Sequence, residues 1–225
     1  MLQPSVIAID GPAGAGKSTL GALLASHLGY LYFDTGVMYR ALALVALQAR
    51  LDLHDEAEMA RLAYEVQIEV VAPTSDDGRQ YTVLVNGEDV TWAIRSPEVE
   101  RNVSLVARYP QVRREMVHQQ QQIGRRGNTV MVGRDIGTIV MPNADLKIFL
   151  EASLEERARR RAVEHNDDLD QTLMAQIQQN LARRDQLDDH VLKPADDAVI
   201  LQTDGLSPDD ELAWILDYLA RHHNG

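Results

Sequence analysis

Short apolar runs alternate with amphipathic stretches along this chain of 225 residues. The apolar run at 6–9 predicts a buried strand, and the leucines that recur at helical spacing over 17–28 predict a helix after it. A second short strand is predicted over 30–33, and a strongly apolar helix over 36–50. Strand, helix and strand at this spacing indicate a parallel sheet that is covered by helices.

The middle of the chain departs from this rhythm. Apolar and polar residues alternate over 66–71 and 81–85, and a polar turn separates the two runs, which predicts an antiparallel hairpin. Ser96 followed by Pro97 predicts the start of another helix, because serine often caps a helix and proline fits its first position. The hairpin therefore indicates a small β-rich insert.

The rest of the chain again combines short buried strands with helices. Further strands are predicted over 129–132, 146–150 and 199–201. The remaining helices are predicted over 55–64, from 110, over 153–165, over 170–187 and from 208. A chain of this length can form one medium domain with a sizeable core.

Composition narrows the classes of function. The formal net charge is −12, and a field of that sign disfavours binding to nucleic acid or anionic lipid. Cysteine is absent, which excludes disulfides and thiolate metal sites. No apolar run reaches the roughly 18 residues of a membrane span, and we find no secretory signal. We therefore expect a cytoplasmic protein with small-molecule substrates and no membrane or nucleic-acid partner. We expect a monomer, because the core leaves no long apolar stripe unassigned.

A phosphate-binding motif follows the first predicted strand. The run Gly-Pro-Ala-Gly-Ala-Gly-Lys-Ser matches the P-loop pattern at every position, with a strand before it and a helix after it, as the motif requires. Its glycines let backbone N–H groups face one anion. Lys17 would reach the β- and γ-phosphates of ATP, and the Ser18 hydroxyl would bind Mg²⁺. The predicted ATP-binding residues are Gly11, Pro12, Ala13, Gly14, Ala15, Gly16, Lys17, Ser18 and Thr19.

Two further turns after predicted strands carry polar side chains. One is Asp-Thr-Gly-Val-Met-Tyr-Arg at 34–40, and the other contains Arg134 and Asp135. Such turns face the ligand crevice of a parallel sheet, and a guanidinium such as that of Arg40 suits the phosphate of an acceptor. The residues alone also allow simpler roles. The start of the first turn could only cap the next helix, and Arg134 could only neutralise Asp135.

Five segments together resemble bacterial cytidylate kinases. They are the P-loop, the Asp-Thr-Gly-x-x-Tyr-Arg turn, the β-rich insert, the Gly-Arg-Asp-x-Gly-Thr loop and the Arg-Arg-Asp-x-x-Asp segment. The resemblance spans nearly the whole chain, and the insert separates this family from adenylate and guanylate kinases. It implies a single P-loop kinase domain over 1–225 with a three-layer α/β/α fold and a central parallel sheet. It also implies a CMP-binding insert at about 66–100 and a helical lid at about 153–188.

The resemblance implies a transfer of the γ-phosphoryl group from ATP to CMP or dCMP with Mg²⁺. The implied acceptor-binding residues are Thr35, Tyr39, Arg40, Ser104, Arg113, Arg134, Asp135, Arg184 and Asp188. Among these, two arginines would hold the phosphate of CMP, and Arg184 with Asp188 would hold the sugar hydroxyls. The implied catalytic residues are Lys17, Arg134, Asp135, Arg157 and Arg161. The last two, with Arg160, would belong to a lid that closes over ATP, although exposed arginines beside glutamates can equally form a solvated surface.

The implied base contacts favour cytosine over uracil. The carboxylate of Asp135 can accept from the N4 amino group of cytosine, and the guanidinium of Arg113 can donate to N3 and O2. Uracil reverses the polarity at N3 and C4, so the same side chains would face unmatched groups. Asp34 or Asp135 could also position Mg²⁺ through water.

One segment departs from the family pattern. Many relatives carry an arginine where this chain has Val191, so one guanidinium that would contact the phosphates is missing. Lys193 could replace its positive charge, but a lysine is a point charge and not a planar fork of donors. Three other interpretations stay open: a kinase for UMP or for a non-nucleotide acceptor, an ATP-driven binding module, and a degenerate fold kept for interaction. A GTP switch is disfavoured because the chain lacks the guanine-reading Asn-Lys-x-Asp segment.

Overall fold

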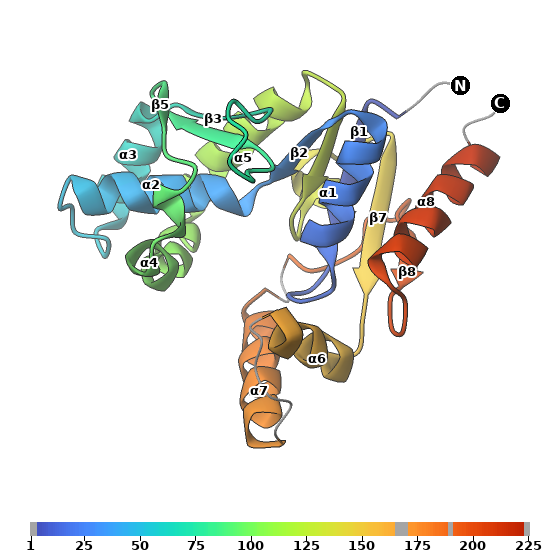
Figure 1. Ribbon diagram of the computed structural model, residues 1–225. Helices are drawn as coiled ribbons and strands as arrows, with labels where there is room; N and C mark the ends of the chain where they lie inside the picture. Colours follow the sequence, from blue (N-terminus) through green and yellow to red (C-terminus); the bar gives the residue numbers. More distant parts are fainter. Residues whose placement is uncertain (1–3, 165–170, 189–190, 223–225) are drawn as a thin grey trace. The chain divides into compact units, whose positions relative to one another are not determined.

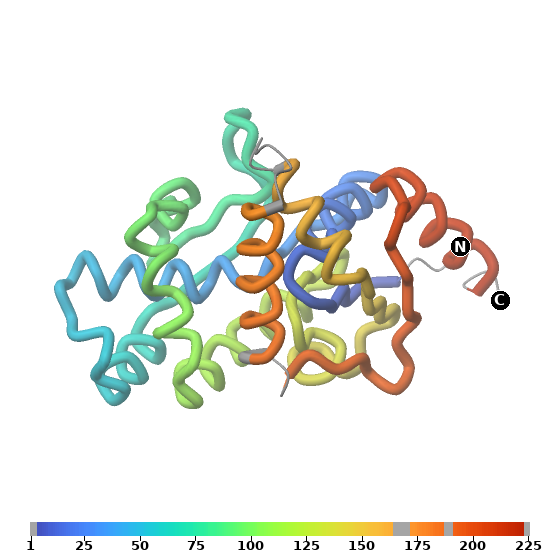
Figure 2. The backbone as a smooth tube through the Cα atoms, turned by 90° about the horizontal axis from the view of Figure 1, so that it is seen from below, coloured from blue at the N-terminus to red at the C-terminus, as the bar shows by residue number. Residues whose placement is uncertain are grey.

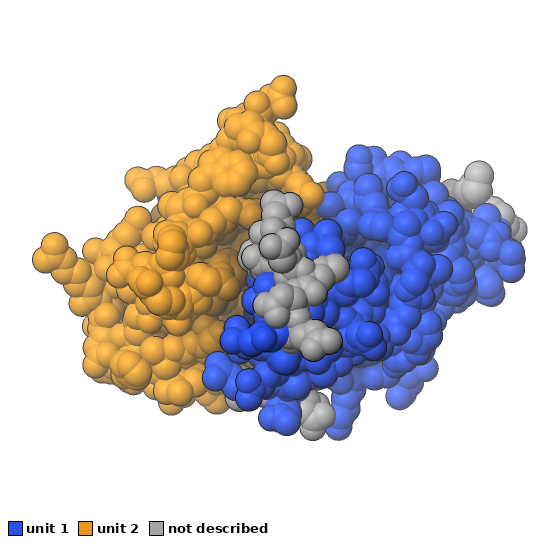
Figure 3. Space-filling model, turned by 60° about the horizontal axis from the view of Figure 1, so that its bottom comes forward, with its two compact units in different colours: residues 1–30, 130–225 blue, residues 31–129 orange. Residues whose placement is uncertain are grey.

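A computed structural model describes residues 4–164, 171–188 and 191–222. Side chains at 164, 171, 187 and 188 are outside this description. The chain divides into two compact units, which Figure 3 shows in different colours. Unit 1 comprises residues 1–30 and 130–225, and unit 2 comprises residues 31–129.

A five-stranded sheet carries the predicted parallel pattern (Figure 1). Its strand order is β2-β6-β1-β7-β8, so β1 and β2 are not neighbours although they follow each other in the chain. β1 pairs in parallel with β7, and β7 pairs in parallel with β8. The strands are β1 (Val6–Asp10), β2 (Leu31–Asp34), β6 (Thr129–Val132), β7 (Leu146–Glu151) and β8 (Val199–Gln202). All five residues of β1 are buried, as in a sheet covered on both faces.

Helices of unit 1 follow these strands. α1 packs against β1 and α8, and α6 packs against α7, as Figures 1 and 2 also show. Their bounds are α1 (Lys17–Leu28), α6 (Leu154–Glu164), α7 (Gln171–Asp188) and α8 (Pro208–His222). α8 begins with a cap in which the Ser207 hydroxyl accepts from the Asp210 N–H at 3.2 Å. None of the described helices is long and apolar enough to cross a bilayer.

Unit 2 contains a second, antiparallel sheet in the order β3-β4-β5. Its elements are α2 (Gly36–Gln48), α3 (Glu56–Glu65), β3 (Ile68–Val71), β4 (Thr82–Val85), β5 (Glu88–Asp89), a short helix at Ala93–Arg95, α4 (Pro97–Ala107) and α5 (Pro110–Gly124). Gln119 of α5 ties the start of this sheet to the helices, because its Oε1 accepts from the Ile68 N–H at 3.0 Å. Its Nε2 also donates to the Val66 carbonyl at 3.0 Å.

The predicted elements are confirmed, with ends that shift by one or two residues. The hairpin pairs antiparallel as expected, and Ser96 caps α4 by accepting from the Val99 N–H at 3.3 Å. The sequence analysis did not predict β5, the helix at Ala93–Arg95 or a wide helical turn at Ile136–Val140. The single domain over 1–225, with its insert at 66–100 and its lid at 153–188, stays a prediction.

The P-loop begins at Gly11, where the backbone conformation and the neighbouring strand β7 leave no room for a side chain. Gly11 has φ of +148°, and a Cβ there would lie 2.5 Å from the Leu150 carbonyl oxygen of β7. Gly29, which ends α1, has φ of +70° with no atom within 4 Å of a Cβ. Gly11→Ala should therefore cost roughly 1–3 kcal/mol of backbone strain plus a further 1–3 kcal/mol of overlap, whereas Gly29→Ala should cost about 1–2 kcal/mol. Urea unfolding measures both free energies, and equal losses would contradict the overlap with β7.

Candidate functional site

The P-loop of unit 1 curls between β1 and α1. Gly11, Gly14 and Gly16 all have positive φ, at +148°, +80° and +95°. Residues 17–20, the first turn of α1, carry no carboxylate, and Gly16 at the N-cap has no side chain to offer to the N–H groups of this turn. Those N–H groups and the positive end of the helix dipole favour a bound anion.

The predicted ATP-binding side chains lie at the start of α1. Lys17 is half-buried, and its Nζ donates to the Pro12 carbonyl at 2.6 Å. Ser18 and Thr19 are exposed. Lys17 therefore lies beside the loop at which the phosphates of ATP are predicted to bind. The Ser18 hydroxyl is accessible to a metal ion.

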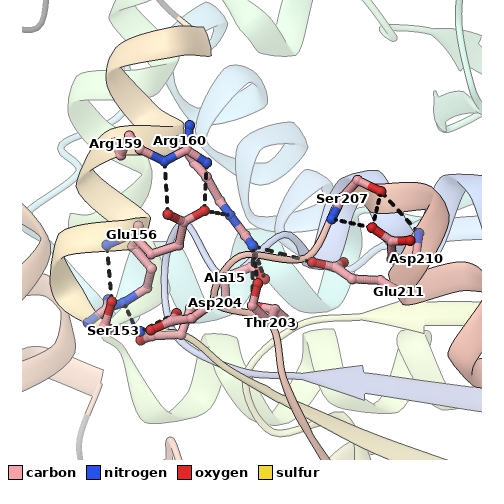
Figure 4. Close-up of polar contacts among 12 residues, drawn as sticks. Ala15, Ser153, Glu156, Arg159, Arg160, Thr203, Asp204, Ser207, Asp210 and Glu211 are labelled. Carbon is pink, nitrogen blue, oxygen red and sulfur yellow. Dashed lines mark hydrogen bonds and ion pairs between the residues drawn. The ribbon is translucent and has the colours of Figure 1, made fainter.

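The outward carbonyls of the P-loop accept hydrogen bonds from α6. Arg157 Nη1 donates to the Ala13 carbonyl at 3.1 Å. Arg160 Nη1 donates to the Ala15 carbonyl at 3.2 Å, a contact that Figure 4 shows. Arg157 is buried and pairs with Asp185 of α7 at 2.8 Å. The two helices of the predicted lid are thus attached to the loop at the start of α6. Arg161, the third predicted lid arginine, is exposed.

A cavity of about 800 Å³ lies beside the loop within unit 1. One part of its lining is apolar and comes from Phe149, Leu192 and Pro194, next to Pro12 of the P-loop. Its polar lining includes Arg157, Asp185, Gln202 and Asp204. A flat ring with polar edges suits such a lining. In this segment the sequence analysis had considered only Lys193 for a binding role. It did not single out the lining residues Leu192, Pro194, Gln202 and Asp204, because they are ordinary for a loop and a strand.

Asp10 fixes the loop that carries Arg134 and Asp135. Its Oδ1 accepts from the Ile136 N–H at 2.8 Å, and its Oδ2 accepts from the Gly137 N–H at 2.7 Å. Burial raises the pKa of Asp10 to about 6. Asp135 is buried and Arg134 is half-buried on the same loop. The sequence analysis missed Asp10, whose only signal was a carboxylate at the end of an apolar strand.

The turn after β2, which carries four polar residues of the predicted site, lies in unit 2. Asp34 Oδ1 accepts from the Gly36 N–H at 2.9 Å and so fixes the turn, whereas Thr35 stands at the N-cap of α2 without a side-chain capping bond. Thr35 is buried, Tyr39 is half-buried, and Arg40 forms an ion pair with Glu100 of α4.

The remaining predicted acceptor residues lie on three helices. Ser104 is exposed on α4, Arg113 is half-buried on α5, and Arg184 is exposed on α7. Asp188 ends α7, and its side chain lies outside the described part of the chain. The acceptor roles of all these residues stay predictions, and so do the catalytic roles of Arg157 and Arg161.

A tyrosine and an arginine that the sequence analysis did not single out lie near the turn after β2. Arg95 Nη2 donates to the Tyr81 hydroxyl oxygen at 3.0 Å. Burial, with a smaller contribution from the charge of Asp34, raises the pKa of Tyr81 to about 12. Tyr81 also packs against Tyr32 of β2, with 5.7 Å between the ring centroids. The sequence carried only a weak signal for a role of Tyr81 in the site, because an isolated tyrosine in a hairpin is usually a packing residue.

Comparisons with known proteins agree with the geometry of the P-loop. Two shikimate kinases of known structure, from Bacteroides thetaiotaomicron and Acinetobacter baumannii, match with a TM-score of 0.52 each, at 14% and 16% identity. They cover 97% and 100% of this chain, and the matches cover 99% and 97% of theirs. At these identities the likeness shows the fold, which is that of P-loop α/β kinases.

Relatives in sequence are much closer. A cytidylate kinase from Chloroflexus aggregans is 67% identical over 218 residues, which cover 96% of this chain and 94% of the relative. A cytidylate kinase from Roseiflexus castenholzii is 54% identical, with 98% and 95% covered, and one from Bacillus subtilis is 46% identical, with 94% of each covered. The family model described as cytidylate kinase matches residues 7–221. The resemblance seen in the motifs is confirmed, and the chain belongs to the cytidylate kinase family.

Proposed function

We propose that this protein transfers the γ-phosphoryl group of ATP to CMP or dCMP, giving ADP and CDP or dCDP. The observation that carries the proposal is a complete P-loop, with three left-handed glycines and Lys17 at the start of α1, in a member of the cytidylate kinase family. The fold alone would fit other acceptors, because shikimate kinases share it.

ATP fits the groups that unit 1 presents. The N–H groups at the start of α1 would hold the phosphates, and Lys17 would leave the Pro12 carbonyl to bind the β- and γ-phosphates. The cavity beside Pro12 and Arg157 would take the base, since its lining combines apolar and polar groups.

Mg²⁺ fits as a partner of the phosphates. Among the described residues, no three His, Asp or Glu side chains gather into a metal site. Mg²⁺ usually keeps several waters and takes one or two protein oxygens beside substrate phosphates. The exposed Ser18 hydroxyl would therefore suffice as the protein ligand of the ion. When bound, the ion neutralises negative charge on the phosphates.

The transfer itself asks the protein for positioning and charge stabilisation. An oxygen of the CMP phosphate forms the new bond to the γ-phosphorus, and the bond to the β–γ bridging oxygen breaks with its electron pair leaving on ADP. No general base is needed, because the attacking oxygen is already an anion near neutral pH. Lys17, Arg134, Arg157 and Arg161 would offset the charge that spreads over the transferring group.

The acceptor assignment rests on the family resemblance. Arg40 and Arg134 would hold the phosphate of CMP, and Asp135 with Arg113 would recognise cytosine. Thr35, Tyr39, Ser104, Arg184 and Asp188 would complete the set. We also propose action in the cytoplasm as a monomer, and the net charge of −12 supports the absence of a nucleic-acid partner.

ADP release with CMP, dCMP, UMP, AMP and shikimate, each offered separately with ATP and Mg²⁺, tests the proposal directly. We expect fast release with CMP or dCMP, weak release with UMP and background release with AMP and shikimate. Removal of Mg²⁺ with a chelator should abolish the fast release. The assignment fails if UMP or shikimate gives the fastest release. It also fails if no acceptor accelerates ATP turnover, which would favour an ATP-driven binding module.

Lys17→Met should lower kcat/KM by at least about 10²–10³, because it removes a cation that binds the transferring group. The fold should be kept, since the half-buried side chain lies at a loop surface. Steady-state kinetics and thermal unfolding together make the measurement. Lys17→Arg is the matched variant, since it keeps the charge with a different shape. Near-normal turnover by Lys17→Met would remove this lysine from the mechanism.

Asp135→Asn should relax the choice between CMP and UMP. An asparagine can turn its carbonyl oxygen to the N4 amino group of cytosine or its amide N–H to O4 of uracil, so the ratio of kcat/KM for CMP to that for UMP should fall by about 10² or more. The KM for ATP serves as the internal control. An unchanged ratio in a folded variant would show that the cytosine is recognised by other residues.

A further inference from the structure

One guanidinium of α6 joins three parts of unit 1. Arg160 Nη1 donates to the Ala15 carbonyl of the P-loop at 3.2 Å. Nη2 of the same group donates to the Thr203 carbonyl at 2.5 Å, just after β8, and Nε donates to Glu156 Oε1 at 2.9 Å. Figure 4 shows these contacts converging on one side chain, which is only 16% exposed. Arg160 is therefore directed at protein carbonyls and carboxylates.

A buried carboxylate lies behind the phosphate-binding loop. Glu211 in the first turn of α8 has a side chain that is 3% exposed, and its Oε1 lies 3.4 Å from Arg160 Nη2. A Cβ built on Gly16 would lie 3.1 Å from Arg160 Nη1 and 3.5 Å from Glu211 Oε2, so both groups lie on the side of this glycine where a side chain would project. Burial raises the pKa of this carboxyl to about 7, against the opposing effect of Arg160.

This placement creates an electrostatic conflict. The start of α8 favours a carboxylate through its helix dipole, but an anion next to Gly16 also opposes the binding of phosphates at the start of α1. Arg160 resolves this conflict, because it offsets the charge of Glu211 and donates to the Ala15 carbonyl. With that carbonyl held outward, the N–H groups on the other side of the loop face the anion site.

We propose that Arg160, held in place by Glu211, is a positioning residue that keeps the P-loop in its phosphate-binding shape. The inference rests on the proposed binding of ATP at this loop. It separates Arg160 from the exposed Arg161 of the same helix, because Arg160 acts through the Ala15 carbonyl and not on the nucleotide. The sequence analysis had grouped both residues, with Arg157, as lid arginines.

Binding of ADP and ATP by calorimetry, with Arg160→Met and Arg159→Met compared, tests the proposal. Arg159 is the matched control, because it lies next along α6 and also bonds Glu156, at 2.8 and 2.7 Å. It is exposed, and its described bonds go to Glu156 and not to the P-loop. Losing a charged hydrogen-bond donor typically weakens binding by tenfold or more. We therefore expect Kd for both nucleotides to rise on the order of tenfold in Arg160→Met and by less than about twofold in Arg159→Met. Equal Kd values in the two variants would overturn the proposal.

The double variant Arg160→Met/Glu211→Gln distinguishes positioning from a general loss of structure. At a pH well above 7, where Glu211 stays ionised, removal of the uncompensated carboxylate should recover at least about threefold of the lost affinity. A merely structural defect would instead deepen with a second substitution. KM for CMP should change less than KM for ATP in every variant. Failure of the double variant to recover affinity would overturn the role given to Glu211.

Arg160→Lys keeps the test decisive if Arg160→Met does not fold. A lysine keeps the charge opposite Glu211 but cannot bridge the Ala15 and Thr203 carbonyls at once, so its Kd should lie between those of the wild type and a full loss. A wild-type Kd in Arg160→Lys would overturn the bridging role. Wild-type protein that binds ADP but does not phosphorylate CMP would refute the proposed function and leave this inference standing.

Discussion

A P-loop can turn its N–H groups toward an anion only if its carbonyl groups, on the other side of the chain, find donors elsewhere. In this protein most of those donors are cationic side chains, although the Pro12 carbonyl also accepts from the Ala15 N–H at 3.3 Å and so keeps a donor when Lys17 binds phosphate. Lys17 donates to Pro12, Arg157 donates to Ala13, and Arg160 donates to Ala15. The loop's shape therefore depends on α6, a helix that begins more than 130 residues later in the chain. These contacts place the start of α6 against the loop.

Bringing cations behind the loop creates a second requirement. A buried guanidinium needs a carboxylate, and the structure supplies Asp185 for Arg157 and the pair Glu156 and Glu211 for Arg160. These carboxylates come from α7, α6 and α8, so the charges tie three helices to one loop. Removal of one partner from such a pair typically costs about 3–5 kcal/mol, because it leaves an uncompensated buried charge. The binding loop and the fold of unit 1 thus share the same interactions.

Local signals explain why most elements were predictable. The bounds of α1 followed from leucine spacing and the P-loop, and Ser96 with Pro97 marked α4, because caps and periodicity act over a few residues. Long-range contacts explain what was missed. Asp10 bonds to backbone groups 126 and 127 residues away. No local sequence pattern indicated that Glu211, in the first turn of a helix, would be buried. The P-loop was predictable as a motif, whereas the groups that support it depend on tertiary structure.

The cations of the predicted site differ in how readily a phosphate can recruit them. Arg40 is 28% exposed and pairs with Glu100, which is 52% exposed, and such surface pairs are worth about 0–1 kcal/mol. A phosphate dianion can displace a partner held that weakly. Arg160 bonds to the P-loop, to Thr203 and to two carboxylates within a nearly buried cluster, so moving it would break several interactions together. This difference in exposure and bonding favours Arg40 as a contact for a substrate phosphate and Arg160 as a support of the P-loop.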